Sequence, residues 1–250
     1  SINKSSIYKN KGFIFENKSF GFENKTFIYS FSRLDRKKFL SSSRFFIVHL
    51  SSEQDTEFME KTKWSETVIL ADADYADAVA FDLIVNFERM LGRRIPKADL
   101  PHWLVCVALD GGVPTGQNEI QVIFVHDKEK KTMDNFIPSD FGKELDGKAF
   151  RDEALGEFTV SSVRAENLVS KEDFFIQSLE ALADEKSIKR LIVVPDMEQY
   201  GLRVKSVLGR TEGKDITLLA MEPQTGRNFK SDILGYSLMS ALGIHSEELK

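Results

Sequence analysis

Acidic side chains follow four of the apolar segments that the sequence predicts as β-strands. Asp72 and Asp74 come directly after one such run, 67–71, and Asp196 and Glu198 follow another. The carboxyl ends of parallel strands share one edge of a sheet, where ligands bind, so we expect these side chains to lie close together. Crowded carboxylates repel one another, and Mg²⁺ or Mn²⁺ relieves that repulsion. The pattern therefore predicts a metal site that activates water against a phosphodiester.

Asp173 joins this group because it lies at the start of the predicted helix that leads into the strand 190–194. Asp110 closes another apolar run and is of second rank. Each acid also has a structural alternative, since an Asp at a helix start commonly caps backbone N–H groups. The predicted catalytic and metal-binding residues are Asp72, Asp173, Asp196 and Glu198, with Asp74 as a further metal ligand.

Apolar runs rich in β-branched residues alternate along the chain with segments of helical spacing. Strands are predicted at 67–71, 103–109, 119–126, 158–163, 190–194 and 215–220. Helices are predicted from Asp77 to Gly92, from Ser170 to Ala183, over 202–208 and after a cap at Ser231. This alternation predicts an α/β domain, a three-layer sandwich with a mainly parallel sheet and helices on both faces.

The composition changes near Met59, the first methionine of the chain. Residues 1–58 hold ten of the 20 Phe and eleven Ser but no Ala or Pro, and their net charge is about +4 against about −9 for residues 59–250. We interpret 1–58 as a low-complexity Phe/Lys/Ser/Asn-rich extension, poorly ordered or read from upstream of the natural start, with a genuine extension as the alternative. Residues 59–250 are predicted to form the single domain.

The overall composition excludes several classes of protein. Apolar runs of the ~18–20 residues that cross a bilayer are absent, and so is the apolar region of a secretory signal. A single cysteine, Cys106, rules out an internal disulfide, and the four histidines lack metal-ligand spacing. We therefore expect a cytoplasmic protein that does not associate with membranes.

Basic residues near the predicted helix ends are candidates for contacts with RNA phosphates. We predict Arg93, Arg94 and Arg203 in this role. The alternative is a solvated helix surface, in which cations at helix C-termini match the helix dipole. The net charge of about −9 in residues 59–250 weakens the case for RNA, because phosphate contacts supply most non-specific affinity.

Two segments resemble the second half of NYN domains, which belong to the PIN-like nuclease superfamily. They are 170–179, SKEDFFIQSL, and 191–200, LIVVPDMEQY, and the segment ILADADY at 69–75 is similar to the first strand of that family. The resemblance covers roughly 67–222 and implies a PIN/NYN-like fold in which Asp72, Asp173, Asp196 and Glu198 hold Mg²⁺ or Mn²⁺ for RNA cleavage. The region also resembles an uncharacterised bacterial family of this kind.

Three departures from the NYN pattern favour a different function. Glu198 replaces the second Asp of an Asp-x-Asp pair, Pro195 replaces a small residue, and Asp74-Tyr75 stand where an Asn is expected. The alternative is therefore a non-catalytic binding or regulatory module that keeps the fold with a degraded site and acts through a protein partner. Asp72-Ala73-Asp74 also resembles the opening motif of haloacid-dehalogenase-type phosphatases, although Ala76 departs from it.

Overall fold

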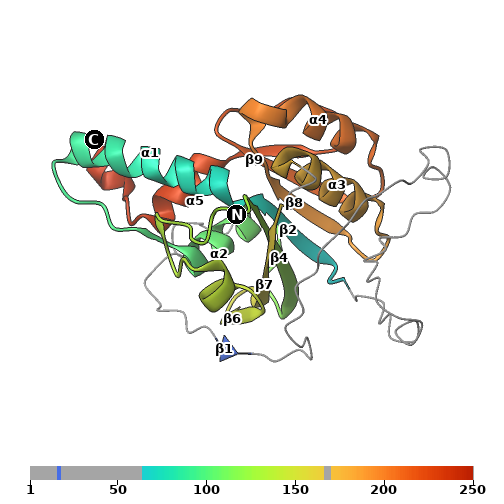
Figure 1. Ribbon diagram of the computed structural model, residues 1–250, viewed down its shortest axis with the longest axis horizontal. Coiled ribbons are helices and arrows are strands. Elements are labelled where there is room, and N and C mark those ends of the chain that lie inside the picture. The colour runs from blue at the N-terminus through green and yellow to red at the C-terminus, as the bar shows by residue number, and fades with distance from the viewer. Residues whose placement is uncertain (1–15, 18–63, 166–169, 250) are drawn as a thin grey trace.

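The central element of the fold is a β-sheet of mostly parallel strands. The computed structural model describes residues 16–17, 64–165 and 170–249 (Figure 1). Across the sheet, the strands within these residues follow the order β1 (Glu16–Asn17), β6 (Lys148–Asp152), β7 (Gly156–Arg164), β4 (Asn118–His126), β2 (Thr67–Asp72), β8 (Arg190–Val194), β9 (Asp215–Ala220) and β10 (Lys230–Ile233). From β7 to β10 the pairing is parallel, whereas β6 is antiparallel to β7 and β1 is antiparallel to β6.

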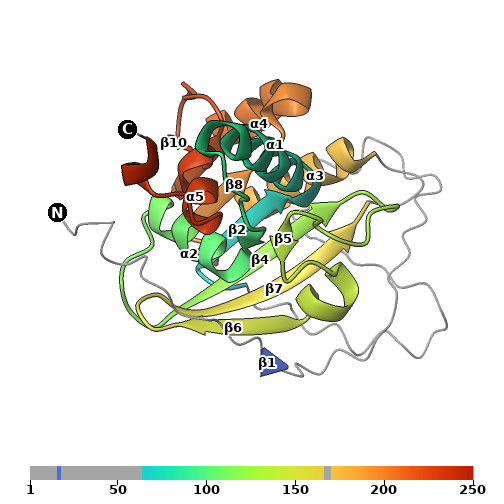
Figure 2. The ribbon, with the colours of Figure 1, turned by 90° about the vertical axis from the view of Figure 1, so that its left-hand side faces the viewer.

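Helices cover both faces of this sheet. One face carries α1 (Ala73–Leu91), α2 (Leu100–Asp110) and α5 (Leu234–Ala241), and the other carries α3 (Lys171–Asp184) and α4 (Met197–Arg210). Figure 1 shows the sheet between these two groups, and Figure 2 looks onto the face that α1, α2 and α5 cover. The prediction of an α/β fold with a mainly parallel sheet and helices on both faces is confirmed.

Strand β2 is buried on both faces because it lies in the middle of the sheet. Its side chains alternate between two apolar cores: Ile69 and Ala71 pack with α1, α2 and α5, and Val68 and Leu70 pack with α3 and α4. None of these four side chains is exposed to solvent. This double burial is why the segment is apolar throughout rather than alternating with polar residues.

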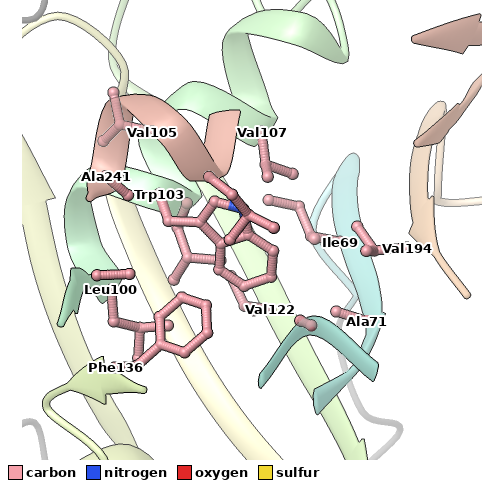
Figure 3. Close-up of a cluster of buried hydrophobic side chains, with 14 of the residues drawn as sticks. Ile69, Ala71, Leu100, Trp103, Val105, Val107, Val122, Phe136, Val194 and Ala241 are labelled. Atoms are coloured by element: carbon pink, nitrogen blue, oxygen red, sulfur yellow. The ribbon is translucent and has the colours of Figure 1, made fainter. Parts of the chain in front are cut away.

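The prediction of a strand over 103–109 is wrong, because this segment forms most of α2. Its residues are apolar on every side and all but the last are buried, so their pattern fits a buried strand as well as a buried helix. The signals of a helix stand just before it: the Asp99 side chain accepts a hydrogen bond from the His102 amide, and Pro101 occupies the first turn. Figure 3 shows Trp103 of α2 packed beside Ile69, Val122 and Phe136 in this core.

Helix α1 begins at Ala73, four residues before the predicted start at Asp77. Asp72 caps it by accepting a hydrogen bond from the Tyr75 amide, and Gly92 ends it with φ of 64°, as the sequence predicted. Asp77 is buried within the helix and does not cap it. Its carboxylate instead accepts a hydrogen bond of 2.8 Å from the backbone amide of Asn135 and so fastens the loop that follows β4.

The remaining elements include short pairings and turns. Two-residue strands β3 (Ala98–Asp99) and β5 (Phe136–Ile137) pair with each other, η3 (Phe141–Leu145) is a π-helical turn, and η4 (Ser246–Leu249) is a 3₁₀ turn. Ser231 was predicted to cap the last helix, but it lies in β10 instead.

The predicted low-complexity extension, residues 1–58, falls outside the described residues except for β1. In the part of the chain that the structure describes, no helix has the length and hydropathy needed to span a bilayer.

Candidate functional site

The chain changes direction across the sheet at strand β2. From β2 it proceeds through β4 to β7 on one side, then returns to the other side of β2 to form β8 and β9. After β2 the chain enters α1 on one face, and after β8 it enters α4 on the opposite face. Asp72 and Asp196 therefore stand at a topological switch point, the place where open α/β sheets bind ligands.

Asp72 is fully buried at this point, and both of its carboxylate oxygens accept hydrogen bonds. Oδ1 accepts from the Tyr75 amide at 3.0 Å and from the Lys171 ammonium at 2.8 Å. Oδ2 accepts from the Tyr200 hydroxyl at 2.5 Å. One carboxylate thus joins β2 to the starts of α1, α3 and α4, because its three partners come from these helices.

Lys171 contacts a second carboxylate, that of Asp74. Its Nζ lies 3.2 Å from Asp74 Oδ2, which also accepts a hydrogen bond of 2.7 Å from the Asp127 amide. Burial lowers the pKa of Lys171, but the charges and hydrogen bonds of Asp72 and Asp74 raise it by more, so the net shift is upward. The ammonium therefore stays protonated between the two carboxylates. Asp74 Oδ1 is buried and has no hydrogen-bond partner in the described residues.

Helix α4 departs from helical geometry at Tyr200, the residue that donates to Asp72. Its φ of −134° and ψ of 22° kink the helix. Gly201 follows, and a Cβ there would lie 2.8 Å from the Met197 side chain. The phenol ring packs 5.3 Å from that of Phe175 in α3. Burial, followed by the negative charge of Asp72, raises the pKa of Tyr200 far above its ordinary value, so the hydroxyl remains a donor.

Tyr75, on the first turn of α1, lies among the carboxylates of the switch point. Its pKa is raised to about 12, first by burial and then by the charges of Asp196, Glu198 and Asp72. No role was predicted for these residues from the sequence: Tyr75 was noted only as a departure from the NYN pattern, and Lys171 and Tyr200 only as parts of the NYN-like segments. The charges of Asp196, Glu198 and Asp72 thus all act on the Tyr75 hydroxyl.

The other predicted ligands take part in separate interactions. Asp196 is 6 % exposed and caps α4, its Oδ1 accepting from the amides of Glu198 and Gln199 at 3.0 Å. The Glu198 side chain is exposed. The side chain of Asp173 is 48 % exposed at the start of α3, where it accepts a hydrogen bond from Ser170 and pairs with Arg203. Its pKa is lowered by these two contacts, in that order.

These donors do not fit a bound divalent cation. Ligands of Mg²⁺ must converge on one point with bonds of about 2.0–2.1 Å. Within residues 64–165 and 170–249, no three Asp, Glu, His or Cys side chains converge in this way. Both oxygens of Asp72 are engaged, and an ammonium already lies between Asp72 and Asp74. Asp110 is the last residue of α2, at the end that leads into β4, and not at the end of a strand.

The arginines predicted to contact RNA are each paired with a carboxylate. Arg93 forms a two-pronged ion pair with Glu248 at 2.7 and 2.9 Å and fastens the C-terminal turn η4 to the end of α1. Arg94 pairs with Glu88 at 3.6 Å, and Arg203 pairs with Glu172 and Asp173. The 19 residues of α1 span about 28 Å at 1.5 Å per residue. Arg93 and Arg94 therefore lie far from Asp72.

Comparisons with known proteins identify a family but no function. No curated protein and no solved structure matches the chain. One protein family matches residues 61–249, which include every element from β2 to η4. The match begins close to the change in composition at Met59. The chain therefore belongs to the family of unknown function DUF6621.

Proposed function

We propose that the protein is a non-catalytic binding or regulatory module whose binding surface is the carboxyl edge of the sheet at the switch point. The observation that carries this proposal is the engagement of Asp72 and Asp74, which share the ammonium of Lys171. A hydrolytic metal centre needs carboxylate oxygens that are free to bind an ion. Here Lys171 and Tyr200 together engage three of the four carboxylate oxygens of Asp72 and Asp74. The fold therefore keeps its ligand-binding edge but not the free oxygens that a hydrolytic metal centre needs.

The side chains that a partner meets at this edge are polar and acidic. Glu198 is exposed on the first turn of α4, and Tyr75 is half-buried on the first turn of α1. The net charge of residues 59–250 is about −9, and Arg203 is neutralised by Glu172 and Asp173. This charge distribution disfavours RNA, whose binding depends on cations that meet phosphates. It supports a protein or small-molecule partner instead.

A titration with MnCl₂, followed by thermal unfolding of the full chain, tests this proposal. An ion at ~100 times its Kd stabilises a protein by ~2.7 kcal/mol, which is a readily measured rise in Tm. We expect no rise, because Lys171 occupies the place between Asp72 and Asp74. We also expect labelled single-stranded RNA to remain intact in the presence of Mn²⁺.

The contrary result would be a rise in Tm that disappears in Asp72→Asn, together with RNA cleavage that disappears in Asp196→Asn. The control for both variants is Asp82→Asn, which changes an exposed acid of α1 two turns beyond Asp74. Its response to Mn²⁺ should equal that of the parent. Metal-dependent stabilisation and cleavage that survive in this control would establish the hydrolase and end the proposal of a non-catalytic module.

A further inference from the structure

Lys171 is the first residue of α3, and its side chain reaches back to the end of β2. Only 17 % of that side chain is exposed, and its Nζ lies 2.8 Å from Asp72 Oδ1 and 3.2 Å from Asp74 Oδ2. Two of the three N–H groups of the ammonium thus point at carboxylates. The first turns of α1, which follow Asp72 directly, contain no Lys or Arg. The positive charge beside Asp72 and Asp74 therefore comes from α3, and its position depends on how α3 packs on the sheet.

The two carboxylates need a positive charge at this place. The Asp72 side chain has no exposure and that of Asp74 has 15 %. A buried carboxylate is strongly destabilising unless it is paired and hydrogen-bonded, and two neighbouring carboxylates also repel each other. In the described parts of the chain, the ion pairs of both residues are made with Lys171.

We propose that Lys171 is a tethered counter-ion that takes the place of a divalent cation between Asp72 and Asp74 and closes this pair to metal ions. This inference rests on the proposed function, in which the edge of the sheet works without metal. The ammonium is covalently part of the chain, so its local concentration does not depend on the metal content of the solution. It follows that removal of the ammonium alone exposes a cation site. The two carboxylates together with water can then supply the oxygen ligands that Mg²⁺ and Mn²⁺ prefer.

The variant Lys171→Met tests the inference, because it keeps the apolar stem of the side chain and removes the charge. In the absence of metal, Tm of the full-length variant should fall below that of the parent. With MnCl₂ at ~100 times its Kd, Tm of the variant should rise by about 5–10 °C while Tm of the parent stays constant. An unchanged Tm in Lys171→Met at all Mn²⁺ concentrations would overturn the inference.

Three control variants separate this explanation from a general effect of lost charge. Lys230→Met removes a lysine that is ion-paired with Asp215, which keeps its second partner Arg190. Lys171→Arg keeps a cation, and Lys171→Met combined with Asp74→Asn removes one of the two carboxylates. None of the three should respond to Mn²⁺. A response of similar size in the double variant or in Lys230→Met would contradict the assigned site.

If Lys171→Met does not fold without metal, the same comparison is made by refolding it with and without MnCl₂. Recovery of the folded chain only with Mn²⁺ supports the inference. Failure in both conditions, while the double variant with Asp74→Asn folds, overturns it, because charge burial would then be the whole effect. A parent that responds to Mn²⁺ contradicts the proposed function. An unresponsive parent with an unresponsive Lys171→Met contradicts the tethered counter-ion alone.

Discussion

Replacing Asp72 with alanine is expected to destabilise the protein by about 3–5 kcal/mol, the range seen when one partner of a buried ion pair is removed. The substitution leaves the mostly buried ammonium of Lys171 without its closest carboxylate and the Tyr200 hydroxyl without its acceptor. It also removes the cap of α1. Denaturant unfolding followed by circular dichroism measures the change in the free energy of unfolding.

Asp99→Ala is the matched control for Asp72→Ala. Asp99 also caps a helix, since it accepts a hydrogen bond from the His102 amide at the start of α2, but it is exposed. Loss of such a cap costs about 1 kcal/mol, so the difference between the two variants measures the buried network. Equal losses in Asp72→Ala and Asp99→Ala would mean that Lys171 and Tyr200 contribute nothing through Asp72.

Truncation of Trp103 to alanine is the second large effect that we expect, again about 3–5 kcal/mol. Trp103 has no solvent exposure and lies at the centre of the core in Figure 3, with ring-centroid distances of 6.3 Å to Phe124 and 5.2 Å to Phe136. Alanine leaves a cavity that β4, which carries Phe124, cannot fill, because this strand is held in the sheet between β7 and β2. Denaturant unfolding again measures the loss.

Two further substitutions define what Trp103 contributes. Its indole N–H is buried and has no hydrogen-bond partner among the described residues. Trp103→Phe therefore loses volume but no hydrogen bond, and it should cost clearly less than Trp103→Ala. Trp64→Ala is the matched control, because Trp64 is only partly buried at the margin of the other core. A loss at Trp64 as large as that at Trp103 would contradict the assignment of Trp103 to the centre of the fold.

The elements that could be predicted from the sequence are those with a distinctive local pattern. The strand over 190–194 was placed correctly because a short β-branched run ends at Pro195 and Asp196. Helix α2 was missed because a segment that is buried on all sides shows neither the helical nor the strand period. Strand β10 was missed because its four residues, KSDI, include two charged residues and a serine.

The candidate site could be predicted only as far as local signals extend. Acids at strand ends indicated Asp72 and Asp74 at the carboxyl edge of the sheet, and both lie there. Their partners Lys171 and Tyr200 are 99 and 128 residues away from Asp72 in the sequence. No spacing rule connects residues so far apart, because their contact depends on how α3 and α4 pack on the sheet. A lysine at the start of an amphipathic helix resembles any solvated cation until that packing is known.

The ammonium of Lys171 itself provides the most direct test of the claim that an internal cation replaces a metal. Nitrogen-15 NMR of the lysine side chains in the full chain observes the Nζ signal, with Lys171→Arg used to assign it. We predict a protonated Nζ with slow hydrogen exchange, which stays protonated above the ordinary lysine pKa and does not change when Mg²⁺ is added. A Lys171 signal that exchanges as fast as those of exposed lysines, or that moves as Mg²⁺ is titrated, would contradict the account.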